Sequence, residues 1–473
     1  MYVNEEQTVR VRTRIGVAIA VVAAVTAAGT GQQAAQAATV QATVTVNLTG
    51  TPRGTLASGY LGLSYESMPR TNDGGVNSGK FDAVGNLPQL LRNLGTGTLR
   101  FGGNSVDRTY ATATPAALQG LVRLADATGW RYVYSTNFAH YNASNTTADA
   151  AAVRTALGAR LKSLVCGNEP DLYVNNAYRP AGYSSSAYVT DVNRCLNVLR
   201  AQAPGVPIGG PDTAGPGWLA NYASSERGRV ALLNNHHYPL SNCNGPNGTA
   251  TGLIAASKRS SEAGLVASAA TTARNNNMQL IMAEVNSAAC GGISGVSNTY
   301  AAALWALDYV FAGVQNGAQG MYFHGALDRA CTGYTSLCET AANQYRPQPI
   351  YYGLLFAKLA GVGAMLPTAI SSPSNLAAHT VRASDGTIRV VLANLSADTI
   401  QTSLWAGTRN GAGSLIRLTA PSLTATSGVQ IQGAAVATNG TFTPGAASPV
   451  SCTSGTCPVT LAPFNAVVVT LPA

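Results

Sequence analysis

The sequence is poor in charged residues, and beyond its first residues it contains no long hydrophobic run. The apolar share of 46% is typical of a globular protein, whereas only 10% of the 473 residues are charged, compared with a usual share of about 25%. The net charge of +9 is scattered, without a stretch rich in Lys and Arg and without alternating basic and aromatic residues. This composition gives little support to nucleic-acid binding, and no later segment has the length of a membrane span. We therefore expect neither a nucleic acid nor a membrane as a partner.

The one long apolar run lies near the N-terminus and predicts a secretory signal peptide over residues 1–37. Arg10, Arg12 and Arg14 precede the run Ile15–Ala28, and Ala35-Gln-Ala37 offers a cleavage site. The run is too short for a membrane anchor and is followed by Gly and Gln residues. We therefore predict a secreted protein.

The sequence also lacks the Cys and His spacing of a zinc site, so we expect no metal and no other cofactor. In an exported chain, its eight cysteines favour disulfides. Cys331 with Cys338, and Cys452 with Cys457, lie close enough in sequence to close small loops. The sequence does not decide how the other four pair, which are Cys166, Cys195, Cys243 and Cys290.

From residue 59 to about residue 362, short apolar runs alternate with amphipathic stretches of helical length. The eight expected strands lie at 60–65, 97–101, 131–134, 164–166, 206–211, 230–233, 279–283 and 320–323. Eight strands, each followed by a helical stretch, predict an α/β fold with a (β/α)8 TIM barrel. An open doubly wound sheet is the alternative, but it would need a glycine-rich phosphate turn after the first strand. Leu63-Ser-Tyr65 does not provide that turn.

Beyond residue 362 the helical pattern stops. Short strand-like runs separated by Gly, Pro, Asn and Ser predict a C-terminal β-sandwich over residues 363–473. Val40–Leu48 alternates Val and Thr in the same manner. We therefore expect residues 38–58 to join the sandwich, and residues 59–362 to form the barrel.

Acidic residues end two of the expected barrel strands. Strand four, Leu164–Cys166, runs into Gly167-Asn-Glu-Pro170, and strand seven ends at Glu284. Pro170 ends the strand and predicts an extended Glu169. Catalytic groups of such barrels gather at the carboxyl ends of the strands, so the two acids should face one another. Hydrolysis of a glycosidic bond needs such a pair, although either acid alone could be a structural partner of an arginine.

Taken in order, the motifs resemble those of clan A glycoside hydrolases and, more narrowly, of family 79, the β-glucuronidases and heparanases. The stretches that carry the resemblance are Leu61–Glu66, Leu99–Gly103, Gly167–Pro170, Gly209–Asp212, His236–Tyr238, Glu284, Gly291–Gly292 and Leu354–Leu359. Together they span roughly residues 55–360. The resemblance implies a retaining double displacement, with Glu169 as general acid/base and Glu284 as nucleophile.

Other residues are candidates for supporting the nucleophile. Arg100 and Tyr238 could both donate to Glu284 and lower its pKa, which would separate the pKa values of the two acids. Arg100 could instead form a buried ion pair that only supports the barrel. His236 and His237 are adjacent on a strand and point to opposite faces, so they do not indicate a metal site.

A second group of candidates would bind the sugar. Asn168 could bond its 2-hydroxyl, and Glu66 and Asn104 suit other hydroxyls, unless these two are only exposed polar caps. By the resemblance, backbone amides of Gly291 and Gly292, together with Tyr351 or Tyr352, would hold a substrate carboxylate. Heparanase has a tyrosine just before its two glycines, whereas this chain has Cys290. The alternative is a loop that binds nothing.

We therefore predict a secreted, monomeric, retaining β-glucuronidase that acts on glycans or glycoconjugates bearing β-linked glucuronic acid. One alternative is a clan A enzyme for neutral β-sugars. The other is a barrel that binds carbohydrate without cleaving it.

Overall fold

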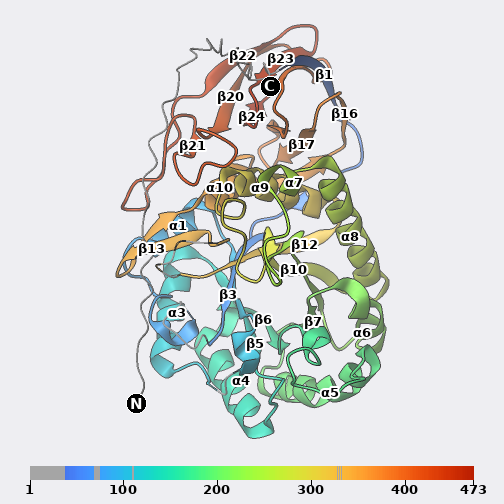
Figure 1. Ribbon diagram of the computed structural model, residues 1–473, viewed down its shortest axis with the longest axis vertical. Helices are drawn as coiled ribbons and strands as arrows, with labels where there is room; N and C mark the ends of the chain where they lie inside the picture. The colour runs from blue at the N-terminus through green and yellow to red at the C-terminus, as the bar shows by residue number, and fades with distance from the viewer. Residues whose placement is uncertain are drawn as a thin grey trace, which may run out of the picture. The chain divides into compact units, whose positions relative to one another are not determined.

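Eight parallel strands close into a barrel, as the sequence predicts (Figure 1). The computed structural model describes residues 38–68, 75–108, 111–327, 329, 331 and 333–472, and the predicted signal peptide lies outside them. In barrel order the strands are β3 (Leu61–Glu66), β4 (Thr98–Gly102), β5 (Arg131–Thr136), β6 (Leu161–Cys166), β7 (Ile208–Thr213), β8 (Leu232–His237), β10 (Gln279–Val285) and β12 (Ala318–Gly325). The last strand pairs with the first, so the sheet has no free edge.

Helices follow the barrel strands, and the longer ones among α3 to α8 cover the outside of the barrel. The helices are α1 (Leu87–Asn93), α2 (Ser105–Arg108), α3 (Pro115–Thr128), α4 (Ala143–Leu157), α5 (Ser185–Gln202), α6 (Leu219–Ser225), α7 (Ala250–Leu253), α8 (Ala256–Asn275), α9 (Tyr300–Gln315) and α10 (Pro349–Leu359). Helices α3, α4 and α5 begin where Thr114, Asn142 and Ser184 accept a backbone N–H with their side chains. In the described residues, no helix combines the length and the apolar character needed to cross a bilayer.

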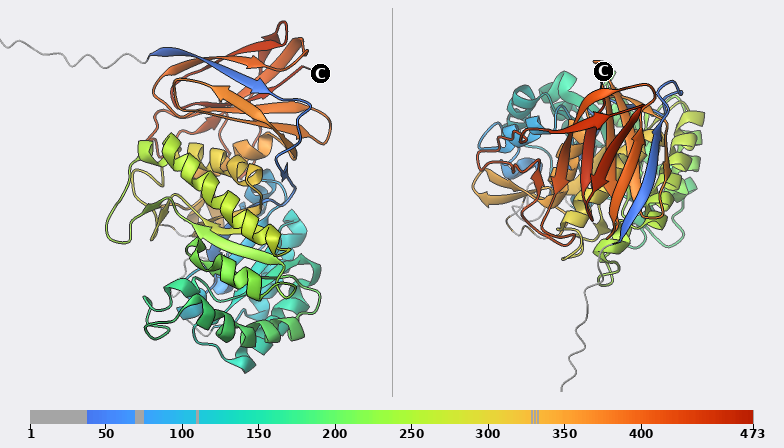
Figure 2. Two further views of the ribbon diagram at one scale, coloured as in Figure 1. Left: turned by 90° about the vertical axis from the view of Figure 1, so that its right-hand side faces the viewer. Right: turned by 90° about the horizontal axis from the view of Figure 1, so that it is seen from above.

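Two antiparallel-rich sheets form the C-terminal β-sandwich (Figure 2). The smaller sheet has the order β16 (Thr368–Ser371), β1 (Thr39–Val46), β19 (Thr399–Trp405) and β23 (Thr456–Leu461). The larger sheet contains β2 (Thr55–Leu56), β15 (Gly363–Leu366), β17 (Leu376–Ala383), β18 (Ile388–Asn394), β24 (Ala466–Thr470), β20 (Gly411–Thr419), β21 (Gln430–Ile431) and β22 (Ser448–Cys452). Alternate apolar residues of both sheets, such as Val44, Val390 and Leu404, meet in a shared core. The N-terminal strand β1 thus lies within the sandwich.

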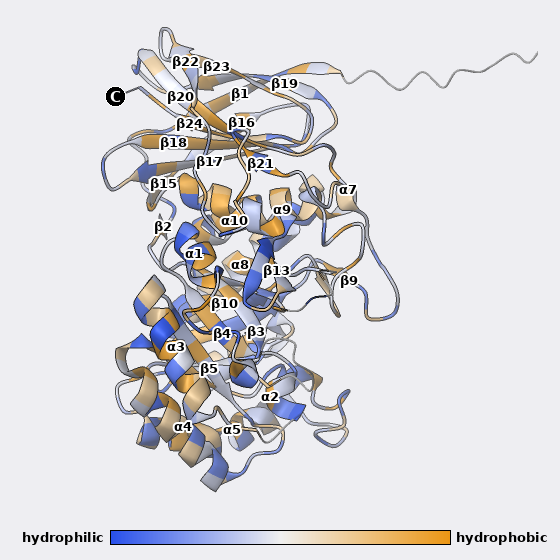
Figure 3. Ribbon diagram, turned by 90° about the vertical axis from the view of Figure 1, so that its left-hand side faces the viewer, coloured by the Kyte–Doolittle hydropathy of each residue, from blue (hydrophilic) through white to orange (hydrophobic). Residues whose placement is uncertain are grey.

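The barrel and the sandwich share a second apolar core. Helix α9 is buried on nearly all sides, and α10 lies beside it (Figure 3). Residues of both helices cluster with Val391 and Val468 of the sandwich. Tyr300 adds two hydrogen bonds, since its backbone N–H donates to Ala425 and its hydroxyl donates to Leu418 at 2.8 Å. A helix that is apolar all round needs such covering on both sides.

All eight cysteines form disulfides. The two predicted local bridges, Cys331–Cys338 and Cys452–Cys457, are present. The other pairs are Cys166–Cys195, between the end of β6 and α5, and Cys243–Cys290, between the loops after β9 (Leu240–Ser241) and β11 (Ala288–Ala289). Two bridges therefore lie next to chain segments that carry site residues.

The native protein is expected to contain no free thiol, because each cysteine is paired. Peptide mapping without reduction should recover the four pairs. Reduction should lower the melting temperature mainly through Cys166–Cys195 and Cys243–Cys290, which span 29 and 47 residues, because longer loops constrain the unfolded chain more. Free thiols at Cys331 and Cys338 in unreduced protein would contradict this prediction.

Candidate active site

Glu169 lies just beyond β6 in a left-handed backbone conformation, with φ 47° and ψ 56°. The extended conformation predicted from Pro170 is therefore wrong. Two hydrogen bonds impose the turn, because Glu169 N–H donates to Asp212 O at 2.7 Å and Leu172 N–H donates to Glu169 O at 2.9 Å. Non-glycine residues adopt this conformation at a cost, and they keep it where their surroundings enforce it.

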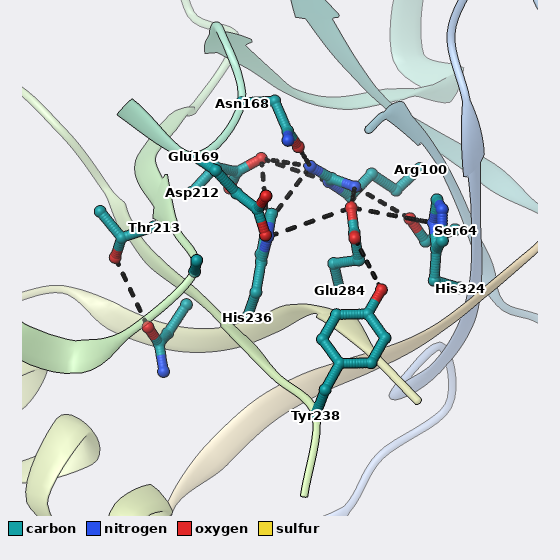
Figure 4. Close-up of polar contacts among 12 residues, drawn as sticks. Ser64, Arg100, Asn168, Glu169, Asp212, Thr213, His236, Tyr238, Glu284 and His324 are labelled. Atoms are coloured by element: carbon teal, nitrogen blue, oxygen red, sulfur yellow. Dashed lines mark hydrogen bonds and ion pairs between the residues drawn. The ribbon is translucent and has the colours of Figure 1, made fainter. Parts of the chain in front are cut away.

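The carboxyl of Glu169 is buried against a histidine (Figure 4). Its Oε1 atom lies 3.0 Å from His236 Nδ1. Burial raises the pKa of Glu169, and this effect outweighs the lowering effect of His236. A raised pKa keeps a carboxyl protonated nearer to neutral pH, as a general acid requires.

The pKa of Glu284 is shifted in the opposite direction to that of Glu169. Arg100 Nη1 donates to its Oε2 atom at 2.7 Å, and Tyr238 OH donates to its Oε1 atom at 2.7 Å (Figure 4). Burial would raise the pKa of this carboxyl, but the nearby His324, His236 and Arg100 hold it well below its usual range. Glu284 is thus kept ionised, which suits a nucleophile.

The two carboxyls lie close together. One oxygen of Glu169, one oxygen of Glu284 and one nitrogen of His236 all lie within 4.8 Å of one another. These three groups could each offer one ligand atom to a metal ion. However, the Arg100 guanidinium donates to Glu284 and lies 3.3 Å from His236 Nε2, and its positive charge would repel a cation. The arrangement therefore fits acid–base and nucleophilic chemistry better than metal binding.

Arg100 joins several barrel strands at the centre of the site. It is fully buried and donates to Asp212 Oδ2 at 2.8 Å, to Ser64 Oγ at 2.9 Å and to Asn168 Oδ1 at 2.8 Å. Burial would raise the pKa of Asp212, but Arg100 and His236 lower it to about 2. Arg100 therefore both supports the barrel through Asp212 and contacts Glu284 directly.

His236 connects the same groups from the other side. Burial would lower the pKa of this histidine, but the surrounding carboxyl groups raise it to about 10. It is thus poised to donate to Glu169. Its neighbour His237 faces away and lies 3.5 Å from Glu262, as the alternation of side chains along β8 requires.

Three of the predicted sugar-binding residues lie at or just beyond the carboxyl ends of β3, β4 and β6. The amide nitrogen of Asn168 is buried and has no hydrogen-bond partner among the described residues, so it is available to a sugar hydroxyl. Glu66, at the end of β3, accepts from Ser105 N–H at 2.7 Å. A Cβ atom on Gly103 would lie 2.6 Å from the Glu66 carboxyl. Only a glycine therefore leaves room for this carboxyl beside the chain segment that leads to Asn104. Glu66 is thus oriented and not a free polar cap.

The loop of Gly291 and Gly292 packs against a tyrosine that we did not predict. Tyr334 lies in the long connection between β12 and β13 (Leu337–Ala341), and a Cβ atom on Gly292 would lie 2.9 Å from its backbone nitrogen. Its ring centroid lies 5.9 Å from that of Tyr238 and 5.8 Å from that of His324. Tyr334 therefore extends from the glycine loop toward Tyr238 and His324, which both lie beside Glu284.

No family model matches the chain, and no curated protein sequence matches it. Solved structures do match. A 4-O-α-L-rhamnosyl-β-D-glucuronidase from Fusarium oxysporum is 22% identical with a TM-score of 0.74, over 91% of this chain and 100% of that chain. A GH51 arabinofuranosidase from Xanthomonas axonopodis is 15% identical with a TM-score of 0.70, over 91% and 100%. A GH family 44 xyloglucanase from Paenibacillus polymyxa is 11% identical with a TM-score of 0.64, over 92% and 100%.

The chain shares the fold of these glycoside hydrolases. At such identities the likeness establishes the architecture. The chemistry depends on the side chains that this chain places in the site.

Tyr351 and Tyr352 use their hydroxyls in contacts with other parts of the chain, which leave their predicted contact with a substrate carboxylate without support. Tyr351 OH donates to Leu90 O of α1 at 2.8 Å. Tyr352 OH accepts from Val436 N–H of the sandwich at 3.2 Å. Both are buried, because α10 packs between α1 and the sandwich and directs the two rings to these neighbours.

Two further residues of the site, Asp212 and Tyr334, were not predicted as site residues. Strand five was expected at 206–211, whereas β7 spans Ile208–Thr213 and carries Asp212 into the site. The motif Gly209–Asp212 could have indicated it, since it ends in an acid. The sequence offered one indication of a role for Tyr334, which is its place in a long connection inside a compact domain, since such connections are often functional.

Proposed function

We propose that the chain is a secreted, monomeric, retaining β-glucuronidase of the family 79 type, acting on glycans or glycoconjugates that bear β-linked glucuronic acid. Glu169 protonates the departing oxygen while Glu284 attacks the anomeric carbon. The resulting glycosyl–enzyme ester is then hydrolysed by a water that Glu169 deprotonates. No cofactor is needed for either step.

The observation that carries this proposal is the pair of buried carboxyls with pKa values shifted in opposite directions. Their oxygen atoms come within 4.8 Å. Retaining enzymes place the two carboxyl groups about 5–5.5 Å apart, whereas inverting enzymes leave about 6.5–9.5 Å for a water. The short spacing supports direct attack by Glu284. Proton NMR of the first-formed product tests it, because retention releases the β-anomer and initial release of the α-anomer would contradict it.

Glucuronic acid is supported by the donors beside the nucleophile. The site already contains the carboxyls of Glu66, Glu169 and Glu284, so an anionic sugar needs neutral donors or cations to bind. Arg100 is occupied by Asp212 and Glu284. The candidate neutral donors are the backbone amides of Gly291 and Gly292 and the hydroxyl of Tyr334. We therefore assign the tyrosine contact with the substrate carboxylate to Tyr334 in place of Tyr351 or Tyr352.

The enzyme is expected to prefer an aryl β-glucuronide over the matching β-glucoside by at least about a hundredfold in kcat/KM. Hydrogen bonds to a charged group contribute about 1.5–3 kcal/mol each, and about 1.4 kcal/mol corresponds to a factor of ten. Replacing Tyr334 by Phe should reduce this preference without abolishing cleavage. Initial rates with aryl glucuronide, glucoside, galactoside and xyloside measure it.

Tyr351→Phe is the matched control, because it removes a buried hydroxyl outside the site. Its substrate preference should equal that of the unmodified enzyme. Equal or faster cleavage of the glucoside by the unmodified enzyme would favour a neutral-sugar glycosidase and leave the two-carboxylate mechanism in place. No cleavage of any aryl β-glycoside would favour a non-catalytic carbohydrate-binding barrel.

A further inference from the structure

Asp107 is a buried carboxyl that takes no part in the mechanism above. It lies on the short helix α2, directly after the strand that carries Arg100, and is 1% exposed. We propose that Asp107 is a positioning residue that fixes the backbone of Asn168 and Glu169 against the rest of the sugar pocket. This inference rests on the proposed role of Glu169 as general acid.

Four donors converge on the Asp107 carboxyl. Oδ2 accepts from Asn168 N–H at 2.8 Å and from Tyr173 OH at 2.6 Å. Oδ1 accepts from Phe138 N–H and Ala139 N–H, both at 2.9 Å. One side chain therefore connects the loop after β5 with both ends of the turn that carries Glu169.

Only an ionised carboxylate accepts from all four donors. Burial raises the pKa of Asp107 above its usual value, and the four hydrogen bonds offset part of that rise, because each stabilises the charged form. An amide in its place has one accepting oxygen and a donating nitrogen. It would leave buried donors of the Glu169 loop without partners.

The close packing of the turn depends on this arrangement. Gly167 has φ +75°, and a Cβ atom there would lie 2.4 Å from Tyr173 Oη and 3.3 Å from Asp107 Oδ2. The glycine thus allows Asp107 to approach the backbone of Asn168.

The same short helix also contacts Glu66 at the end of β3. Ser105, two residues before Asp107, donates its backbone N–H to Glu66 at 2.7 Å. Helix α2 therefore holds Glu66 at one point and the Glu169 loop at another. Asp107 sets the distance between the acid/base and the sugar-binding end of the site, without touching the reacting atoms.

The test is Asp107→Asn in the full chain, measured with two aryl β-glucuronides. Phenyl glucuronide needs a proton for departure of its aglycone, whereas 2,4-dinitrophenyl glucuronide does not. A displaced general acid should lower kcat/KM for the phenyl substrate by about a hundredfold, since acid catalysis contributes about 10²–10⁴-fold. The dinitrophenyl substrate should lose far less, so the ratio of the two rates changes.

Asp149→Asn is the matched control. Asp149 is also buried, at 7% exposure, and accepts from Tyr134 OH at 3.1 Å and Ala113 N–H at 3.4 Å, but it makes none of the contacts to the Glu169 loop. Its ratio of rates should equal that of the unmodified enzyme. If Asp107→Asn does not fold, Tyr173→Phe removes one of the four donors and should change the ratio in the same direction, by less.

Two outcomes overturn the assignment alone: equal loss on both substrates in Asp107→Asn, or, where that variant does not fold, an unchanged ratio in Tyr173→Phe. An equal change of ratio in Asp149→Asn overturns it too, because any buried carboxyl would then have the same effect. If the unmodified chain cleaves neither substrate nor any other aryl β-glycoside, the proposed function itself fails, and the assignment fails with it.

Discussion

Replacing Glu284 by Gln is expected to lower kcat by about 10⁴-fold or more, even with a dinitrophenyl leaving group. The amide matches the carboxyl in shape and can still accept from Arg100, so the site should keep its form. It is not nucleophilic, however, and removing the nucleophile of a covalent mechanism costs about 10⁶-fold in well-studied cases. Steady-state rates with 2,4-dinitrophenyl β-glucuronide provide the measurement.

Glu262→Gln controls for the loss of a buried acid. Glu262 is 2% exposed, accepts from Trp305 Nε1 at 3.0 Å and lies outside the site. This variant should keep most of its activity. A Glu284→Gln enzyme that still turns over at a tenth of the normal rate would rule out Glu284 as nucleophile.

Replacing Glu169 by Ala should slow cleavage of phenyl glucuronide by about 10²–10⁴-fold and leave dinitrophenyl glucuronide able to form the glycosyl–enzyme. Azide should then restore turnover, because a small anion fits the space left by the side chain and needs no base. The product should be the β-glucuronosyl azide. Glu284→Ala with azide should instead give the α-azide, since the anion then attacks from the vacated nucleophile's side. If Glu169→Ala gave the α-azide, the two roles would be reversed.

The pH profile of the same variant follows from the two pKa shifts. As general acid, Glu169 must be protonated, so the rate of the unmodified enzyme falls as the pH rises through its raised pKa. Glu284 must be ionised, so the rate falls on the acid side only below its depressed pKa. Glu169→Ala should therefore lose the alkaline limb for kcat/KM on dinitrophenyl glucuronide. An alkaline limb that stays in place would assign that titration to another group.

The barrel and its two acids could be predicted because they depend on local patterns. An apolar run that ends in an acid places that acid at the mouth of any parallel barrel, whatever the neighbouring strands contain. Glu169 and Glu284 are therefore fixed by strand order alone. The same reasoning was less accurate at β7, because the strand was predicted to end at Pro211, whereas it continues to Thr213 and carries Asp212.

Residues that depend on long-range packing were not predictable in the same way. Tyr351 and Tyr352 occupy a helix whose direction relative to α1 and the sandwich is set by packing, so counting along the sequence could not orient their rings. Tyr334 approaches the site through a loop held by Cys331–Cys338. The left-handed turn at Glu169 likewise depends on Asp212, which lies on another strand.

Strand β1 has a consequence for how this protein is made. It begins at Thr39 and pairs in parallel with β19, so that Gln41 bonds Gln401 across 360 positions of sequence. Strand β1 therefore leaves the ribosome first, but it can pair with β19 only after most of the polypeptide has been synthesised. Contacts between such distant positions form slowly, and an unpaired strand is exposed to wrong partners meanwhile. The smaller sheet would thus close among the last steps of biosynthesis, and a chain stopped short of residue 399 could not complete it.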